Sequence, residues 1–134
     1  MNVVVLQGRL SRPVSERNLP SGDRMAILDL TVAGSGDPPG RAESVPLAWF
    51  DAPSWAGELD TGAELVVVGR VRRRFFRAGP ALQSRTEVVV EAGALATRPA
   101  RVAAIVARAT AELSAPPEGQ AKRRSRRKAP PTFP

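Results

Sequence analysis

The sequence predicts an all-β protein, a small closed barrel of five short strands, and two observations lead to this prediction. Short runs of β-branched and apolar residues recur along the first 95 residues, separated by segments rich in glycine and proline. Two of these runs, VVVLQGRL and VVVGRVR, are each interrupted by a glycine, which often marks a bulge or a sharp bend in a strand. A small barrel needs such bends in order to close.

The first two strands lie on either side of a turn-rich segment. Residues 3–10 form the first strand, with Gly8 as its bend, and residues 11–24 contain two prolines and a glycine that favour turns. Residues 25–33, MAILDLTVA, form the second strand, in which apolar side chains alternate with a more mixed set. The apolar set is Ala26, Leu28, Leu30 and Val32.

The remaining strands follow a flexible loop at residues 34–43, which holds three glycines and two prolines. A short helix that starts near Pro53 and ends near Leu59 separates the third strand from the fourth. Residues 77–84 are expected to form a hairpin loop between the fourth strand and the fifth. The three strands are expected at residues 44–50, 65–76 and 85–95.

A C-terminal helix is predicted from about residue 99 to 114, because apolar residues recur there at helical spacing and alanine favours a helix. These apolar residues are Val102, Ile105, Val106, Ala109 and Leu113. The chain is therefore expected to have a barrel domain at 1–97, a helix at 98–115 and a tail at 116–134. The tail is rich in proline, arginine and lysine, and its composition predicts disorder.

The composition argues against an enzyme and against a metal site. The chain has no cysteine and no histidine, which removes disulfides, thiolate nucleophiles, most zinc sites and most general-base triads. We therefore expect no catalytic residue, no metal and no cofactor. There is neither a signal-peptide pattern nor an apolar run of membrane length, so we expect a cytoplasmic protein without membrane attachment.

The positive charge is concentrated in two places. The net charge is +7 at pH 7, yet residues 1–97 hold 11 arginines and 11 acidic residues, so the excess lies in residues 98–134. A second cluster lies within the barrel domain, at Arg70, Arg72, Arg73, Arg74 and Arg77. A basic segment on a neutral domain suggests a polyanionic partner such as nucleic acid, although a tail that only aids solubility is the alternative.

The order of strands and helix matches an OB-fold barrel, and five short motifs resemble the bacterial single-stranded DNA-binding proteins. Together they span about residues 2–95, and the chain is identified as a member of that family, of the actinobacterial type or a paralogue. The motifs are NVVVLQGRL at 2–10, LPSG at 19–22, MAILDLTVA at 25–33, GRVR at 69–72 and TEVVV at 86–90.

The chain departs from the family pattern in three places. Ser44 stands where the third strand of the family carries a tryptophan, while Phe50 keeps the later aromatic of that strand. The loop at 34–43 lacks the aromatic residue often found there. The chain ends in APPTFP after a basic run, whereas the family often ends in an acidic tip, the docking segment for replication and repair proteins.

The alternation of side chains in VVVGRVRRRFF predicts a surface for single-stranded DNA. Arg72, Arg74 and Phe76 share one face of the strand by period 2, with Arg70 below them, while Arg73 and Phe75 share the other face. Sequence-independent binding needs cations that follow the phosphates and flat rings that stack on bases. The resemblance implies that Phe76 is a base-stacking ring, although Phe75 and Phe76 are alternatively residues of a barrel end or a subunit interface.

Other residues complete the predicted site. Trp49 and Phe50 are neighbours in a strand and point to opposite faces, so we expect Phe50 to face the ligand and Trp49 to lie in the core or an interface. Trp55 is expected to pack in the short helix. Arg9 and Arg85 are expected to flank the groove, and Arg77, from the basic cluster, is expected to belong to the binding site.

The function predicted from these residues is non-enzymatic binding of single-stranded DNA, which protects it during replication, repair or recombination. The resemblance implies a homo-oligomer, a homotetramer in most members, with replication or repair proteins as possible partners. Two alternatives remain open at this point. One is an OB-fold adaptor that binds other proteins, and the other is a paralogue that binds RNA and has weak affinity for DNA.

Overall fold

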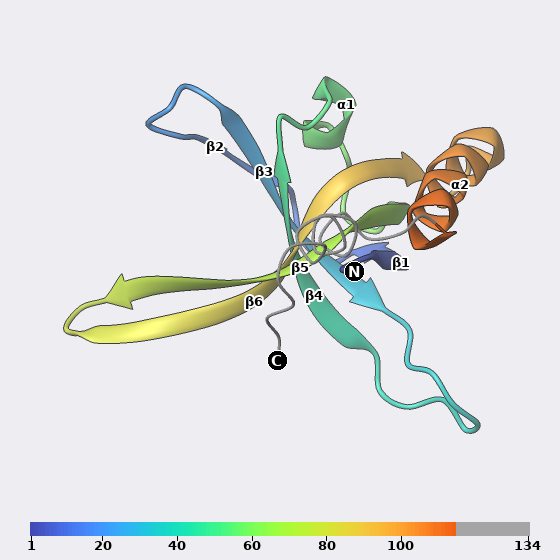
Figure 1. Cartoon of the computed structure of the whole chain (residues 1–134), viewed down its shortest axis with the longest axis horizontal. Coiled ribbons are helices and arrows are strands. Elements are labelled where there is room, and N and C mark those ends of the chain that lie inside the picture. The colour runs from blue at the N-terminus through green and yellow to red at the C-terminus, as the bar shows by residue number, and fades with distance from the viewer. Residues whose placement is uncertain (115–134) are drawn as a thin grey trace, which may run out of the picture.

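The structure, a computed structural model, describes residues 1–114 of the chain. The predicted tail at 116–134 lies outside the described residues. The described part contains six strands and two helices, shown in Figure 1. In order they are β1 (Val4–Leu10), β2 (Ser15–Asn18), β3 (Arg24–Val32), β4 (Glu43–Phe50), α1 (Ser54–Gly57), β5 (Glu64–Ala78), β6 (Ala81–Leu95) and α2 (Pro99–Ser114).

Five of the strands close into a barrel. β1 pairs antiparallel with β5 from Val4 to Arg9, and its last two residues, Arg9 and Leu10, also pair antiparallel with β3. β3 pairs with β4, and β5 pairs with β6, both antiparallel. The ring is completed by a short parallel pairing of β4 with β6. This topology confirms the predicted five-stranded OB-fold barrel with a short helix between its third and fourth strands.

Gly8 and Gly69 provide the two predicted irregularities. A Cβ on Gly8 would collide with the carbonyl oxygen of Thr31, at the point where β1 changes partner from β5 to β3. Gly69 follows a register shift between β5 and β6, and a Cβ there would collide with the carbonyl oxygen of Val89. Only glycine permits these close backbone approaches. The two runs interrupted by glycine therefore mark the places where the backbones of neighbouring barrel strands lie closest to each other.

The core fills the inside of this barrel with aliphatic side chains and one indole. The predicted apolar face of β3 is confirmed, because Ala26, Leu28 and Leu30 are buried. Trp49 is only 5% exposed, as predicted for a core residue, and its ring lies where a side chain on residue 93 would have to be, so Gly93 gives it room. Trp55 packs edge-on against Trp49 with ring centroids 5.6 Å apart, which agrees with its predicted packing role.

Two connections differ from the prediction. The segment expected to consist of turns contains β2, which pairs with β3 and has all four residues exposed, so no alternation of apolar residues reveals it in the sequence. The prediction of a loop over residues 77–84 is wrong. β5 runs to Ala78 and β6 starts at Ala81, so the turn is confined to Gly79, which has φ 63°, and Pro80.

As a result, the β5–β6 hairpin extends well beyond the barrel as a two-stranded arm, defined here as residues 70–86 and visible in Figure 1. The side chain of Asn2 anchors its base, because it accepts a hydrogen bond from the Val71 N–H at 2.9 Å and donates one to the Val71 carbonyl at 2.8 Å. The arm therefore leaves the barrel at a fixed position.

The C-terminal helix has the predicted bounds and packs against β5 and β6. Ala109 is buried, and Val102, Ile105 and Val106 are half-buried, whereas Leu113 at the end of the predicted apolar stripe is exposed. Among the described residues, no helix is long and apolar enough to cross a membrane.

Candidate nucleic-acid interface

A groove of about 360 Å³ lies on the outer surface of the barrel, where β3 and β4 meet the base of the arm. Its position follows from the alternation of side chains in these strands. Because Ala26, Leu28, Leu47 and Trp49 point into the core, their neighbours point outward. The outward-facing neighbours that form the apolar floor of the groove are Met25, Ile27, Pro46 and Ala48, with the ring of Phe50 at the same level.

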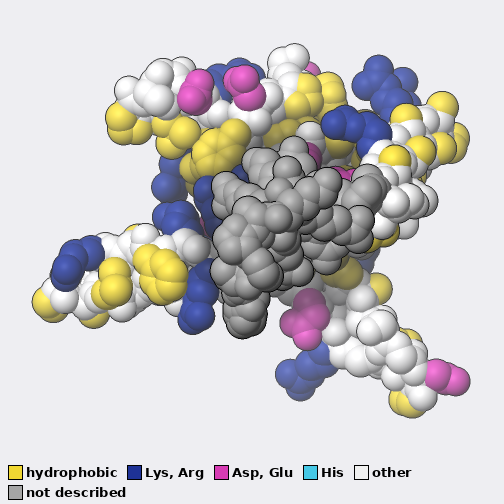
Figure 2. Space-filling view, viewed as in Figure 1, with side chains coloured by type: hydrophobic (Ala, Val, Ile, Leu, Met, Phe, Trp, Pro, Cys, Tyr) yellow, Lys and Arg dark blue, Asp and Glu magenta, His cyan; other side chains and the backbone are white. Residues whose placement is uncertain are grey.

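Cations form the wall of the groove on the side of the arm. Arg72 and Arg74 come from β5, and Arg85 comes from β6, where it lies opposite Arg74 in the register of the two strands. A fourth cation, Arg17, lines the groove from β2, the strand that the sequence did not reveal. Basic side chains flank the arm where it joins the barrel in Figure 2. Four guanidinium groups around an open apolar floor suit a polyanion that also carries flat apolar groups.

A buried carboxylate holds two of these cations in place. Glu87 is 6% exposed and lies opposite Arg72 in the register. Arg72 Nη2 donates to Glu87 Oε2, and Arg74 Nε lies 3.5 Å from Glu87 Oε1. Both arginines are therefore oriented before any ligand arrives, which lowers the side-chain entropy lost when they bind a phosphate. Sequence reasoning included Glu87 only in a strand motif and missed this role, although its pairing with Arg72 follows once the hairpin register is known.

Replacing Glu87 with glutamine is expected to lower the free energy of unfolding by about 1–3 kcal/mol, because it leaves the partly buried Arg72 without its charged partner. Urea denaturation followed by circular dichroism measures the change. Glu91→Gln is a matched control, because Glu91 is on the same strand but is exposed and should change stability by less than about 0.5 kcal/mol. Equal effects of the two substitutions would show that Glu87 has no special anchoring role.

Two aromatic rings alternate with the groove arginines. The Arg72 guanidinium carbon lies 5.4 Å from the centre of the Phe50 ring, and the corresponding atom of Arg74 lies 5.2 Å from the centre of the Phe76 ring. Both rings are half-buried. The structure thus brings together Arg72, Arg74 and Phe76, as the period-2 pattern predicted, and adds Phe50 from the neighbouring strand. Each cation lies within cation–π distance of one ring, so rings and charges form a continuous surface.

The other face of the arm carries a separate pair. The Arg73 guanidinium carbon lies 5.6 Å from the centre of the Phe75 ring, which is 61% exposed and faces away from the groove. Arg77 lies opposite Leu82 on this same face, by the register of the arm. Phe75 and Arg77 were both predicted as site residues, and the structure places them apart from the groove.

Two further predicted residues also lie outside the groove. Arg70 is exposed on the outer face of β5, on the same side as Arg72, but does not line the groove. Arg9 lies in β1 and lines a different hollow, together with Gln7, Thr31 and Glu64. Of the predicted flanking cations, only Arg85 is at the groove.

The described residues contain no group of three or more histidine, cysteine, aspartate or glutamate side chains that could hold a metal ion. In the groove, Glu87 is the sole acid, and it is engaged with Arg72 and Arg74. The surface offers charge and flat rings, which suit non-covalent binding of a polyanion.

Comparisons with known proteins agree with this fold. No protein-family model and no curated protein matches the sequence. Among solved structures, the chain is similar to the wild-type single-stranded DNA-binding protein from Thermus aquaticus, with a TM-score of 0.58 and 25% sequence identity. The match covers 73% of this chain and 41% of that chain, so this protein spans about two fifths of the length of the one it matches. The match confirms the resemblance to single-stranded DNA-binding proteins that the sequence motifs indicated.

Proposed function

We propose that this protein binds single-stranded DNA, with the groove and the adjoining face of the arm as its contact surface. The observation that carries the proposal is the alternation of Arg72 and Arg74 with Phe50 and Phe76 on one solvent-facing surface. Phosphates pair with the guanidinium groups, and bases stack on the rings, which is how strands are bound regardless of sequence. The similarity to the Thermus aquaticus protein supports the same function.

The lining of the groove favours binding without strong sequence preference. Apart from its four arginines and Glu87, the groove is lined by apolar side chains, with no amide or hydroxyl side chain among them. Amide side chains read base edges through paired hydrogen bonds, and arginine can pair with guanine in the same way, but two of the four groove arginines are engaged with Glu87. Stacking and phosphate contacts are therefore the main interactions available to a bound strand.

The proposed biological role is to cover exposed single strands during replication, repair or recombination, in the cytoplasm at the nucleoid. A strand held against the groove is shielded from reannealing and from nucleases. The protein is proposed to act as a homo-oligomer, without enzymatic activity and without a cofactor.

The salt dependence of binding tests the proposal. Arg74→Gln combined with Arg85→Gln is expected to reduce the slope of log K against log salt by about 1.4, because the slope falls by about 0.7 for each phosphate of a single strand that is no longer neutralised. Fluorescence anisotropy of an end-labelled dT oligonucleotide, titrated at several salt concentrations, measures the slope. The matched control is Arg73→Gln with Arg77→Gln, which removes two cations from the opposite face of the arm and should leave the slope unchanged.

Two outcomes would count against the proposal. An absence of micromolar binding by the unaltered protein at low salt would exclude a single-strand-binding role. Equal slopes for the groove variant and the control variant would place the strand elsewhere on the molecule. A matched RNA oligonucleotide in competition separates DNA from RNA preference.

A second candidate function, a protein-interaction adaptor, is favoured by one observation. Phe75 and Leu82 lie on the face of the arm away from the groove and are 61% and 65% exposed. Exposed apolar side chains of this size are suited to a protein contact. Recovery of protein partners from a nuclease-treated lysate, abolished in a Phe75→Ala, Leu82→Ala variant, combined with weak oligonucleotide binding by the pure protein, would support this role.

A further inference from the structure

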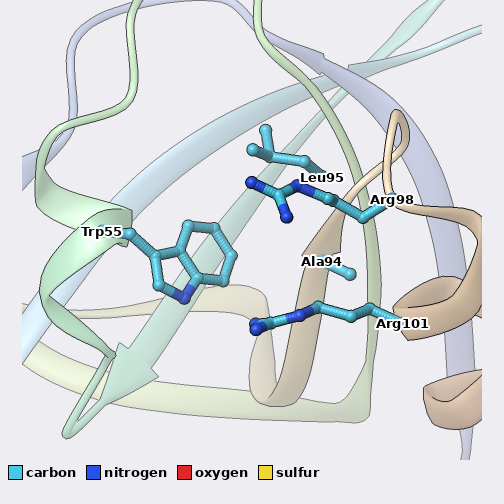
Figure 3. A pocket seen from close by; sticks show the side chains of 5 residues that line it. All are labelled: Trp55, Ala94, Leu95, Arg98 and Arg101. Atoms are coloured by element: carbon cyan, nitrogen blue, oxygen red, sulfur yellow. The ribbon is translucent and has the colours of Figure 1, made fainter.

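A second hollow, about 200 Å³ in volume, lies near α1 and the start of α2, away from the groove. It is lined by Trp55 from α1, by Ala94 and Leu95 at the end of β6, and by Arg98 and Arg101 around the start of α2. Figure 3 shows the two arginines extending toward the indole ring of Trp55 from the opposite side of the pocket. We call this the Trp55 pocket.

Backbone hydrogen bonds fix the turn that precedes α2, from which the two arginines of this pocket extend. The Arg98 N–H donates to the Leu95 carbonyl at 3.0 Å, and the Arg98 carbonyl accepts from the Val102 N–H at 3.0 Å. The Ala96 N–H donates to the Glu64 carbonyl at 2.9 Å, which ties the same turn to β5. The turn between β6 and α2 is thus held at both ends, and Arg98 and Arg101 lie beside the pocket because of it.

The charge of the pocket favours an anion. No acidic side chain lines it, and neither Arg98 nor Arg101 has an ion-pair partner within residues 1–114. The first turn of α2 also has no acidic residue. Cations near the N-terminus of a helix are unfavourable because that end carries partial positive charge, and a bound anion relieves both the dipole and the arginine charges.

The ring in the pocket favours a flat ligand. Trp55 is half-buried, and its ring plane is held at 81° to that of Trp49 by their edge-on contact. An orientation fixed in this way suits stacking, because the ring loses little freedom when a second flat group lies on it. Ala94 and Leu95 add apolar surface beside it. A ligand with a flat apolar part and a negative charge next to it has the chemistry of a nucleotide.

The cations continue beyond the pocket. Arg108 lies seven residues after Arg101 in α2 and thus on the same flank of the helix, roughly 10 Å further along. A line of cations suits an extended polyanion better than a single carboxylate group.

We propose that the Trp55 pocket is a second contact for single-stranded DNA, in which one base stacks on Trp55 and its phosphate pairs with Arg98 and Arg101. This inference rests on the proposed function, since the same strand occupies both sites. Ala94 is seven residues beyond Glu87 on β6, which separates the pocket from the groove by roughly 23 Å along the strand. A strand with the 3.4 Å rise of stacked bases needs about seven nucleotides to occupy both places, and a more extended strand needs fewer.

The distribution of tryptophan allows the two sites to be observed separately. The chain has two tryptophans, and neither lines the groove, whose aromatic lining residue is Phe50, with Phe76 beside Arg74 on the adjoining face of the arm. Trp49 is buried, so the accessible indole is that of Trp55. Quenching of intrinsic fluorescence therefore reports the Trp55 pocket, while the anisotropy of an end-labelled oligonucleotide reports binding anywhere on the protein.

The experiment titrates the full chain with dT oligonucleotides of about 4 and about 20 nucleotides, lengths that fall on either side of the span from groove to pocket. Four arginines line the groove and two line the pocket, so a short strand is expected to occupy the groove first. At one equivalent of oligonucleotide, we therefore expect both lengths to raise anisotropy and only the longer one to quench the fluorescence. Trp55→Phe should abolish the quenching. Arg98→Gln with Arg101→Gln should weaken binding of the longer oligonucleotide about fivefold or more and lower its salt slope by about 0.7, the value for one phosphate, with little effect on the shorter one.

The outcomes distinguish this inference from the proposed function. Anisotropy changes without quenching, or an arginine variant that binds both lengths like the unaltered protein, would overturn the pocket proposal and leave the groove in place. No anisotropy change at either length would overturn the proposed function itself. Quenching by a short acidic peptide containing an aromatic residue, but not by the longer oligonucleotide, would show that the pocket binds protein and would overturn its assignment to DNA.

Discussion

Replacing Phe50 and Phe76 together with alanine is expected to weaken the binding of a dT oligonucleotide by about 30-fold or more. Each stacked base contributes about 1–3 kcal/mol, so the loss of two rings removes at least about 2 kcal/mol. The rings come from different strands, β4 and β5, and each lies beside a different arginine of the groove, so the two effects are expected to add. Anisotropy titrations at fixed salt measure the change.

Phe75→Ala is the matched control for this experiment. It also removes a phenylalanine ring from the arm, but this ring lies beside Arg73 on the face directed away from the groove. Binding should change by less than about twofold, because every stacked base of the groove is retained. If the control weakens binding as much as the double substitution does, or if the double substitution has no effect, the groove is not the binding surface.

Replacing Trp49 with alanine is expected to lower the free energy of unfolding by about 3–5 kcal/mol, the usual cost of truncating a large buried aromatic residue. Trp49 is 5% exposed and lies over Gly93, and its ring packs at 81° against that of Trp55. The surrounding strands belong to a closed barrel and have little freedom to collapse into the cavity. Urea denaturation followed by circular dichroism measures the loss without relying on tryptophan emission.

Trp49→Phe provides the companion variant, because it keeps an aromatic ring in the core and should cost less than Trp49→Ala. Its fluorescence would then come from Trp55 alone. A change of less than about 1 kcal/mol in the alanine variant would show that the indole is not buried as the structure has it.

The barrel could be predicted because its strands carry strong local signals. Alternation of apolar residues predicts a strand at residues 25–33, and apolar residues at helical spacing predict a helix at 99–114. The two runs interrupted by glycine predict strands that bend. β2 carries no such signal, because all four of its residues are exposed and it exists only by pairing with β3. The length of the arm was not predicted, because the glycine and the proline at residues 79 and 80 suggested a loop over 77–84. In the structure these two residues form the whole turn, and the strands continue up to it on both sides.

The candidate site could be predicted only in part. Side chains alternate between the two faces of a strand, so every second residue of β5 shares a face. The sequence alone therefore places Arg72, Arg74 and Phe76 on one face correctly. The contributions of Arg17, Met25 and Glu87 depend on which strands lie side by side, and this is a tertiary property. The same property decides the position of Arg9, which was expected to flank the groove and which β1 directs into a different hollow.

The arm that Asn2 anchors has an exposed strand edge, and this edge affects whether copies of the protein aggregate. Beyond Val71, the outer edge of β5 has no neighbouring strand within the described residues, so its amide and carbonyl groups form a template for intermolecular β-pairing. Charged side chains on an edge strand oppose such aggregation. The arginines from 72 to 77 repel the same edge of a second copy, so the groove arginines among them, which are proposed to attract phosphates, also oppose edge-to-edge pairing of the free protein.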